Sequence, residues 1–516
     1  MSRLALALGL LGLAVAGAST VGSAGAASPP RPNIIVVLTD DQTFTDLYER
    51  AGSGSGAKVM PKTRHLLGGN GVTFRRAYAS NPMSCPSRST FLTGQYSHNH
   101  RNVTNVFPTG KYCSHRGLRF SFQKTLPVWL HAAGYRTLHF GRFLNAFGLG
   151  HPHKVPPGWD WYVQPVDTKV SATAVYTGYR LNINGRLTQK FGNKRKPSQR
   201  KYFTNVMVRM ALKQIAHTDP SRPFYVALDH RAPHEDEIDP VGPQPAPRHR
   251  NDFRGKPPRH PKNFDEADVS DKAAWLRHSD QLSASNEKKI STRNVRRLRA
   301  LRSVDDGVGR MIRFLAASHR LADTYIFFMS DNGFELGEHW ISKGKFRPYQ
   351  ESSHVPLIVR GPGIPDGRVS RELVTNVDIA PTLVQIAGAS PTRRLDGRSL
   401  LPFAHNPGLR SRRPILLEGY PPGKTALKKK GHGATKLPEP TPPNWQAIVR
   451  GRWKLIHYHR QGFELYDLKK DPFELRSLDG VRRYHNVFKV LKRRLKKLKH
   501  CAGDACNRPM KAPRLP

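Results

Sequence analysis

Long apolar stretches are what this sequence most clearly lacks. Its one sustained run, Leu4–Ala16, is too short for a comfortable membrane span, and no later stretch reaches about 18 apolar residues. A transmembrane anchor is therefore not expected. Arg3 precedes the run and the small residues Ala24–Ala26 follow it, which is typical of a secretory signal peptide. We predict that residues 1–26 are removed and that the mature protein is soluble and exported, to the periplasm or the extracellular space.

Acidic residues are also scarce. The chain has 38 Asp and Glu against 84 Lys and Arg, which gives a formal net charge of +46. Such an excess favours polyanionic partners such as nucleic acids, sulfated glycans or anionic membranes, although a merely solvated basic surface would account for part of it. No recognised nucleic-acid-binding motif accompanies the charge, so a nucleic-acid partner is not expected.

Cysteine is rare as well, with four residues in a chain of 516. An even number of cysteines fits an exported chain in an oxidising compartment. We predict two disulfides, Cys85–Cys113 and Cys501–Cys506, of which the second closes a short loop behind the last predicted helix. The first would tether the neighbour of Ser84 to the loop after His98–His100. The alternative is that Cys85 is a free buried thiol.

What the sequence does contain is a series of continuous apolar runs. Asn33–Thr39 is typical of a buried parallel strand. Similar runs lie at Tyr135–Phe140, Phe224–Leu228, Thr324–Met329 and Val355–Val359. Helical patterns such as Lys124–Ala133 and Val295–Ser318 lie between them, and this alternation predicts an α/β sheet covered on both faces. The length and the 38% hydrophobic content suffice for one large core and a smaller domain.

Polar residues follow several of these runs, at the edge where open α/β sheets bind ligands. They are Asp40, Asp41, Arg142, His234, Asp331 and Asn332. The three aspartates and the asparagine supply hard oxygen ligands, which suit Ca²⁺ or Mg²⁺. Taken alone, Asp-Asn-Gly is also an ordinary turn.

The segment Ser84–Arg88 (Ser-Cys-Pro-Ser-Arg) is the most informative stretch. Pro86 is predicted at the first position of a helix, which puts Ser84 just before the helix, beside unpaired N–H groups. That position suits a nucleophile, an oxyanion or a metal ligand, and Arg88 would add a permanently charged donor. The ordinary alternative for such a pattern is an N-capped surface helix.

The predicted domains are a catalytic domain at 27–420, a flexible connection at 421–444 and a C-terminal subdomain at 445–516. Within the first, Pro240–Asn294 is predicted to be a long irregular surface excursion. In the third, Trp445–His457 alternates like a β-hairpin, and Val481–His500 is an amphipathic helix with a basic outer face. That face is either simply solvated or an extended binding surface for a polyanion.

The run Ser84–Gly94 resembles the sulfatase signature at every specified position: Cys or Ser, any residue, Pro-Ser-Arg, three residues, Leu-Thr-Gly. Its continuation through His100 looks like the glucosamine-6-sulfatase and extracellular sulfatase branch, where Cys-Cys-Pro-Ser-Arg is usual and Ser84 replaces the first cysteine. Residues 155–159, 303–306, 355–363 and 377–383 are similar to the same family. The resemblance implies an alkaline-phosphatase-like α/β fold, a large mixed sheet with helices on both faces, plus a smaller C-terminal antiparallel sheet with a helix.

The resemblance also implies a mechanism. A maturase would oxidise residue 84 to formylglycine, whose hydrated aldehyde attacks sulfur; elimination from the resulting ester then releases sulfate. One calcium ion would bind to Asp40, Asp41, Ser84, Asp331 and Asn332.

Cationic side chains would offset the charge of the sulfate oxygens. The resemblance implies that these side chains are Arg88, Arg142 and Lys345. Lys343 is an alternative candidate for the position of Lys345. Arg142 stands where the branch has a lysine, and it cannot shuttle a proton as a lysine can.

His234 would hydrogen-bond the ester oxygen and assist protonation of the leaving group. His98, His100 and Asn145 would face the substrate. The ordinary alternatives are a loop or capping histidine for His234, surface histidines for His98 and His100, and solvated loop lysines.

These expectations describe an exported, calcium-dependent sulfatase acting on the 6-sulfate of a glucosamine-type sugar or a related sulfated glycan. Two other classes stay open. An unmodified Ser84 could serve a metal-dependent phosphoesterase, because serine attacks phosphorus as an alkoxide. Alternatively, the chain could be a catalytically silent binder of sulfated polysaccharide.

Overall fold

The structure, a computed structural model, describes residues 31–49, 58–105, 113, 118–166, 176–193, 196–236, 241–420 and 440–513. The predicted signal peptide and residues 421–439 of the predicted connection lie outside the described residues. Residues from Arg31 onward form one compact unit. Among the described helices, none is both long and apolar enough to cross a bilayer.

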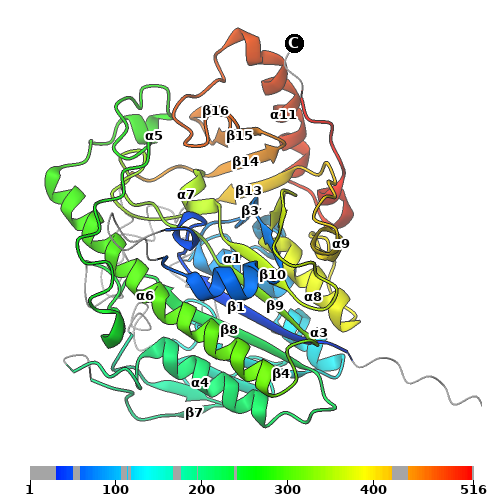
Figure 1. Cartoon of the computed structure of the whole chain (residues 1–516). Helices are drawn as coiled ribbons and strands as arrows, with labels where there is room; N and C mark the ends of the chain where they lie inside the picture. The colour runs from blue at the N-terminus through cyan, green and yellow to red at the C-terminus, as the bar shows by residue number, and fades with distance from the viewer. Residues whose placement is uncertain are drawn as a thin grey trace, which may run out of the picture. The chain divides into compact units, whose positions relative to one another are not determined.

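A ten-stranded mixed sheet organises this unit (Figure 1). In spatial order its strands are β11 (Arg368–Ser370), β2 (Val72–Phe74), β10 (Leu357–Arg360), β9 (Thr324–Ser330), β1 (Asn33–Asp40), β8 (Phe224–Pro233), β4 (Arg136–Gly141), β5 (Trp161–Pro165), β6 (Leu181–Ile183) and β7 (Arg186–Leu187). The central strands β9, β1, β8, β4 and β5 are parallel, and β10 runs against its neighbours β9 and β2. The carboxyl ends of the parallel strands, and of β2 and β11, therefore meet at one edge of the sheet.

Strand β1 separates two apolar cores. Its alternate residues Ile35 and Val37 pack on one face with α4 (Phe203–Ala216) and α6 (Ala284–Ala317). Ile34, Val36 and Leu38 pack on the other face with α3 (Leu126–Ala132) and α8 (Ile379–Ala387). A strand buried on both faces has no polar alternation, and this explains the continuous apolar run in the sequence.

The predicted irregular excursion Pro240–Asn294 is wrong at its C-terminal end. Helix α6 begins at Ala284, where Ser283 caps it by accepting a hydrogen bond from the N–H of Asn286. The first turns of α6 are largely exposed and carry few apolar residues, so the hydrophobic periodicity that marks a helix is weak there.

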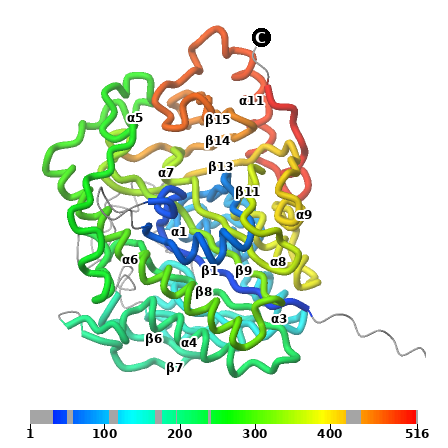
Figure 2. Tube along the Cα trace, viewed as in Figure 1, coloured from blue at the N-terminus to red at the C-terminus, as the bar shows by residue number. Residues whose placement is uncertain are grey.

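A separate antiparallel sheet lies in the C-terminal part of the chain. Its strands are β13 (Ile415–Gly419), β14 (Trp445–Arg450), β15 (Trp453–Tyr458) and β16 (Gly462–Asp467). Helix α11 (His485–Leu498) lies beside this sheet in Figure 2 and buries Val487, Leu491, Leu495 and Leu498 on it. Because β13 is an edge strand of the small sheet, that sheet begins before the predicted boundary at residue 420.

Candidate active site

Helix α1 (Ser84–Thr93) points its N-terminus at the carboxyl edge of the large sheet, and all ten of its residues are buried. Ser84 is its first residue and Pro86 its third, so the predicted helix start at Pro86 is two residues late. Proline is tolerated there because the first four N–H groups of a helix have no partner within the helix. The N–H of Cys85 instead donates to the side chain of Asn105, at 2.9 Å.

Four oxygen-bearing side chains surround the hydroxyl of Ser84. Asp40 ends β1 and Asp41 follows it, and Asp331 and Asn332 follow β9; all four are at most 1% exposed. The Ser84 hydroxyl lies 3.5 Å from Asp40 Oδ1 and 3.4 Å from Asn332 Oδ1. The structure therefore brings together the five residues that the sequence analysis assigned to one metal site.

The backbone at Asp41 turns the chain back toward the sheet. Its φ of 71° lies in the left-handed region, which aspartate tolerates better than most residues. In this conformation the N–H of Asp41 donates to Asp331 Oδ1 at 3.1 Å, and its carboxylate accepts from Asn332 at 2.6 Å. Gly333 completes the arrangement, because a Cβ there would lie 1.9 Å from the carbonyl oxygen of Glu351. The Asp-Asn-Gly sequence is therefore a tightly packed segment that directly follows β9.

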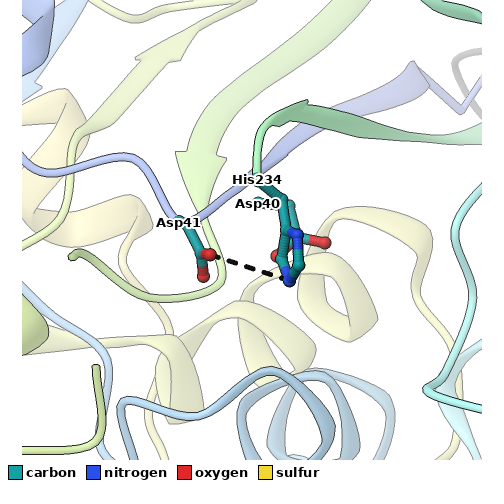
Figure 3. A group of neighbouring side chains, drawn as sticks. All are labelled: Asp40, Asp41 and His234. Atoms are coloured by element: carbon teal, nitrogen blue, oxygen red, sulfur yellow. Dashed lines mark ion pairs between the residues drawn. The ribbon is translucent and has the colours of Figure 1, made fainter. Parts of the chain in front are cut away.

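The donor set fits a hard divalent cation. Side chains of Asp40, Asp41 and His234 each offer a ligand atom within 4.8 Å of one another (Figure 3). Carboxylate and amide oxygens dominate the cluster once Asp331 and Asn332 are included, and such donors favour Ca²⁺ or Mg²⁺. The imidazole of His234 lies at its margin, 3.8 Å from Asp41 Oδ2.

Three cations face these carboxylates. The guanidinium of Arg88 lies 2.9 Å from Asp331 and 3.4 Å from Asp40, and Arg142 also hydrogen-bonds Asp40. Lys345 donates to the Ser84 hydroxyl at 2.7 Å and pairs with Asp41.

Lys343, the competitor for the sulfate-binding position, lies 3.5 Å from Glu235 with its side chain 38% exposed. The geometry therefore favours Lys345.

Burial and charge act against each other on the site's ionisable groups. Burial raises the pKa of Asp40, but the cations Arg142, Arg88 and Lys345 hold it well below its ordinary value. Burial and then Asp40 raise the pKa of Asp331 to about 6. Burial and then Arg231 lower the pKa of His234 to about 3, so its ring is neutral.

Two predicted substrate-side histidines lie elsewhere. His98 contacts Glu418 at 3.0 Å and the carbonyl of Cys501 at 2.9 Å, so both its ring nitrogens are engaged. His100 is buried, and its ring contacts Thr90 and the N–H of Asn102. Neither histidine has a ring nitrogen left to bind a substrate, because both nitrogens of each ring already contact other residues.

Asn145, the third predicted substrate-side residue, differs from the two histidines. Its amide oxygen is buried and has no hydrogen-bond partner among the described residues. It follows Arg142 by three residues, in the segment after β4, and it remains a candidate for contact with substrate.

Asp229 and His139 form a second layer that the sequence analysis missed. Asp229 lies in β8, 3.7 Å from Arg88, and accepts a hydrogen bond from His139 at 3.2 Å. At the adjacent end of β4, Gly141 lets the two strands approach, because a Cβ there would lie 1.8 Å from the carbonyl oxygen of Asp229. The available signal was a charged residue directly after the apolar run Phe224–Leu228 in the sequence.

Both predicted disulfides are present. Cys85 pairs with Cys113, and Cys501 pairs with Cys506. The first attaches the second residue of α1 to a residue 28 positions further along the chain, and the alternative of a free Cys85 thiol is therefore wrong.

A mixed sheet whose carboxyl edge gathers carboxylates and cations around a buried hydroxyl defines an alkaline-phosphatase-like α/β hydrolase site. More narrowly, the chain belongs to the sulfatase family, because the Sulfatase family model matches residues 32–389. A second model, N-sulphoglucosamine sulphohydrolase C-terminal, matches residues 439–501.

Relatives of known name agree with this assignment. Human N-acetylglucosamine-6-sulfatase is 30% identical over 509 residues, which cover 94% of this chain and 87% of that protein. An extracellular sulfatase Sulf-1 homolog of Caenorhabditis elegans is 35% identical over 374 residues, or 72% of this chain. The chain spans 48% of that relative, about half of its length.

Solved structures share the fold. One was solved in complex with its substrate D-glucosamine-2-N,6-O-disulfate; it matches with a TM-score of 0.66 and 24% identity, over 91% of this chain and 97% of that one. A phosphonate monoester hydrolase of Agrobacterium radiobacter matches with a TM-score of 0.64 and 22% identity, over 91% of this chain and 95% of that one.

Proposed function

We propose that this protein is an exported sulfatase that hydrolyses the 6-sulfate ester of a glucosamine-type sugar or a related sulfated glycan. One observation carries the proposal: the buried side chain of residue 84 lies at a helix N-terminus, within 3.5 Å of Asp40, Asn332 and Lys345. The name of the human relative, N-acetylglucosamine-6-sulfatase, points to the same bond and the same type of sugar.

The chain's own residues would bind and orient the sulfate. Arg88 and Arg142 present fixed, permanently charged donor groups, and Lys345 lies directly against residue 84. Preorganised charges of this kind stabilise the charge that develops on sulfate oxygens as the ester bond breaks. The carboxylates hold these cations in place before the substrate arrives.

Two groups complete the site in this proposal. Asp40, Asp41, Asp331, Asn332 and residue 84 would hold Ca²⁺, which supplies positive charge beside the transferring sulfate. Residue 84 would be converted by a maturase to formylglycine, which supplies a hydrated aldehyde as the nucleophile. His234, neutral and beside Asp41, would hydrogen-bond the ester oxygen of the leaving sugar.

Mass spectrometry of the peptide that contains Ser84, together with an aryl sulfate assay, tests the proposal. Only the protein converted at residue 84 should turn over the aryl sulfate. Co-expressed with a cysteine-specific maturase, wild type should be poorly active and Ser84→Cys more active, with Ser87→Cys as the matched control. Sulfate hydrolysis by a protein that carries an intact Ser84 side chain would contradict the role of the aldehyde.

A phosphoesterase is the second candidate, and the contact of Lys345 with the Ser84 hydroxyl favours it, because an adjacent ammonium stabilises an alkoxide. It predicts that unmodified wild type cleaves aryl phosphates and no sulfate ester. A silent polysaccharide binder would do neither, and the complete set of charged groups around residue 84 argues against it.

A further inference from the structure

A cavity lies outside the residues that surround Ser84. It is a groove of about 760 Å³ that lies between the loop after β1, the ends of β2 and β11, and the turn after β16. Six of its lining residues carry the argument below, and we call the cavity the arginine groove. They are Phe44, Tyr48, Glu49, Arg75, Arg76 and Arg371.

The three arginines of the groove have no carboxylate partner among the described residues. Arg75 and Arg371 are exposed, and the guanidinium of Arg76 donates to the carbonyl of Gly451. Guanidinium groups that bind no internal acid keep their charge available for a ligand, and their planar donor forks match the oxygens of sulfate or phosphate esters.

Two of the acidic residues nearby, Glu49 and Glu372, are already engaged. Glu49, which lines the groove, lies 3.1 Å from Lys256 and 3.5 Å from Arg259. Glu372, next to Arg371 in the chain, pairs with Arg398 at 2.6 Å. The net charge that the groove presents is therefore positive.

The lining of the groove also includes aromatic side chains. Phe44 and Tyr48 are half-buried, with ring centroids 5.1 Å apart, and His354 stacks on Phe44 at 4.4 Å. Flat apolar surface beside cationic side chains suits a ligand that carries both an apolar face and anionic groups. A pyranose ring with sulfate substituents has this character, whereas an isolated inorganic anion would make no use of the rings.

The groove shares its sheet edge with the candidate active site. Arg75 and Arg371 directly follow β2 and β11, whose carboxyl ends lie at the same edge as Asp40. Strand β2 is three positions from β1 in the sheet, a separation of about 14 Å at the usual strand spacing. An extended chain of a few sugar units can cover that distance along one edge.

We propose that the arginine groove is a second binding site for sulfated polysaccharide, which holds a neighbouring part of the chain whose terminal sugar occupies the active site. This inference rests on the proposed function for its choice of ligand. Its consequence is selectivity by length, because a single sulfated sugar bound at residue 84 leaves the groove empty.

The test compares wild type with a triple variant, Arg75→Gln, Arg76→Gln and Arg371→Gln. The probes are a heparin octasaccharide, measured by titration calorimetry, and glucosamine-6-sulfate, measured by turnover. Losing three cationic contacts to the ligand should weaken octasaccharide binding roughly tenfold and flatten its salt dependence. Monosaccharide turnover should change less than twofold, since the arginines do not contact residue 84 or its neighbours.

A matched control removes the same charge elsewhere: Arg209→Gln, Lys213→Gln and Arg313→Gln, on the exposed sides of α4 and α6. It should bind the octasaccharide as wild type does. Equal affinity of the triple variant and wild type overturns the proposal, and so does an equal loss in both triple variants. If the first triple variant loses as much affinity for a single-stranded oligonucleotide as for the octasaccharide, the choice of a sugar ligand is overturned.

The groove and the proposed function can fail separately. Calorimetry measures binding without turnover, so arginine-dependent octasaccharide binding supports the groove even in a protein that cleaves no sulfate. Conversely, turnover of glucosamine-6-sulfate with no effect of the arginines upholds the function and overturns the groove.

Discussion

Arg88 is the central cation in the charge balance of the site. Its guanidinium is buried against Asp331, Asp40 and Asp229, which raise its pKa despite the burial. Three carboxylates around one cation leave an excess of negative charge. Arg142 offsets part of it at Asp40, and Lys345 pairs with a fourth carboxylate, Asp41. This balance explains how so many ionised groups persist in a buried site: each is paired.

Asp229 should act as a positioning residue for Arg88. Asp229→Asn keeps the size of the side chain but removes the charge that faces Arg88 at 3.7 Å. We expect kcat/KM for an aryl sulfate to fall roughly tenfold, or about 1.4 kcal/mol, mainly through KM, because the sulfate is held less firmly. Asp229→Glu should lose less kcat/KM than Asp229→Asn. The control Asp219→Asn, at an exposed carboxylate, should leave kcat/KM unchanged. A loss in kcat alone would contradict a positioning role.

Asp331 should matter for metal affinity as well as for activity. Asp331→Asn retains an oxygen that can accept from the N–H of Asp41 but removes one negative charge from the oxygen cluster. We expect calcium affinity, measured by calorimetry on chelator-treated protein, to fall at least about tenfold, with turnover lost in parallel. Full activity of wild type after removal of all divalent metal would contradict the metal site.

At the scale of elements, helix α11 shows how periodicity fixes which face is buried. The predicted apolar stripe holds for Val487, Leu491, Leu495 and Leu498, which are buried on the small sheet. Val481 is 36% exposed because the chain there precedes the short helix η6 (Arg482–Tyr484) and does not belong to α11. Lys492 covers the rings of Phe463 and Phe488, so part of the basic face also packs.

The charges of α11 that stay in solvent should bind polyanions without affecting catalysis. A variant with Lys489, Arg493, Lys496 and Lys497 all changed to Gln leaves Lys492 on its rings and Arg494 on the carbonyl of Arg508. We expect it to elute from heparin at lower salt than wild type, because fewer counterions are released on binding. Its turnover of a small sulfated sugar should be unchanged.

The control for α11 changes four exposed basic residues on α4 and α6. These are Arg209, Lys213, Lys289 and Arg313, each replaced by Gln. If this control and the α11 variant elute at the same salt, only net charge matters and the helix is a solvated face.

At the scale of the whole molecule, much of the site could be predicted because its residues follow strands. Asp40, Arg142 and Asp331 each end or follow an apolar run, and parallel strands bring their carboxyl ends together. His98 and His100 could not be placed in this way. They lie in a short helix after α1. His100 contacts Thr90 and Asn102 close by, but the partners of His98, Glu418 and Cys501, are more than 300 residues away in the chain. Sequence spacing carries no signal for such contacts.

His98 connects the segment after α1 with the C-terminal sheet and the end of α11. Its ring contacts Glu418, in β13, and the carbonyl of Cys501, and its side chain is 14% exposed. Burial lowers the pKa of His98, but Glu418 outweighs burial and raises the pKa from 6.5 to about 9. The folded protein therefore binds this proton more tightly than the unfolded chain does.

The sign of the pH effect follows from that difference. The charged pair contributes its full stability below pH 6.5, where both states are protonated, and loses it as the pH rises toward 9. We expect His98→Gln to lower the free energy of unfolding at pH 6 by on the order of 2–3 kcal/mol more than at pH 9. Urea unfolding of wild type and variant at both pH values measures this. His217→Gln, at an exposed helix end, should show no such difference, and parallel pH profiles of wild type and His98→Gln would refute a role for the His98–Glu418 pair in joining the two parts of the fold.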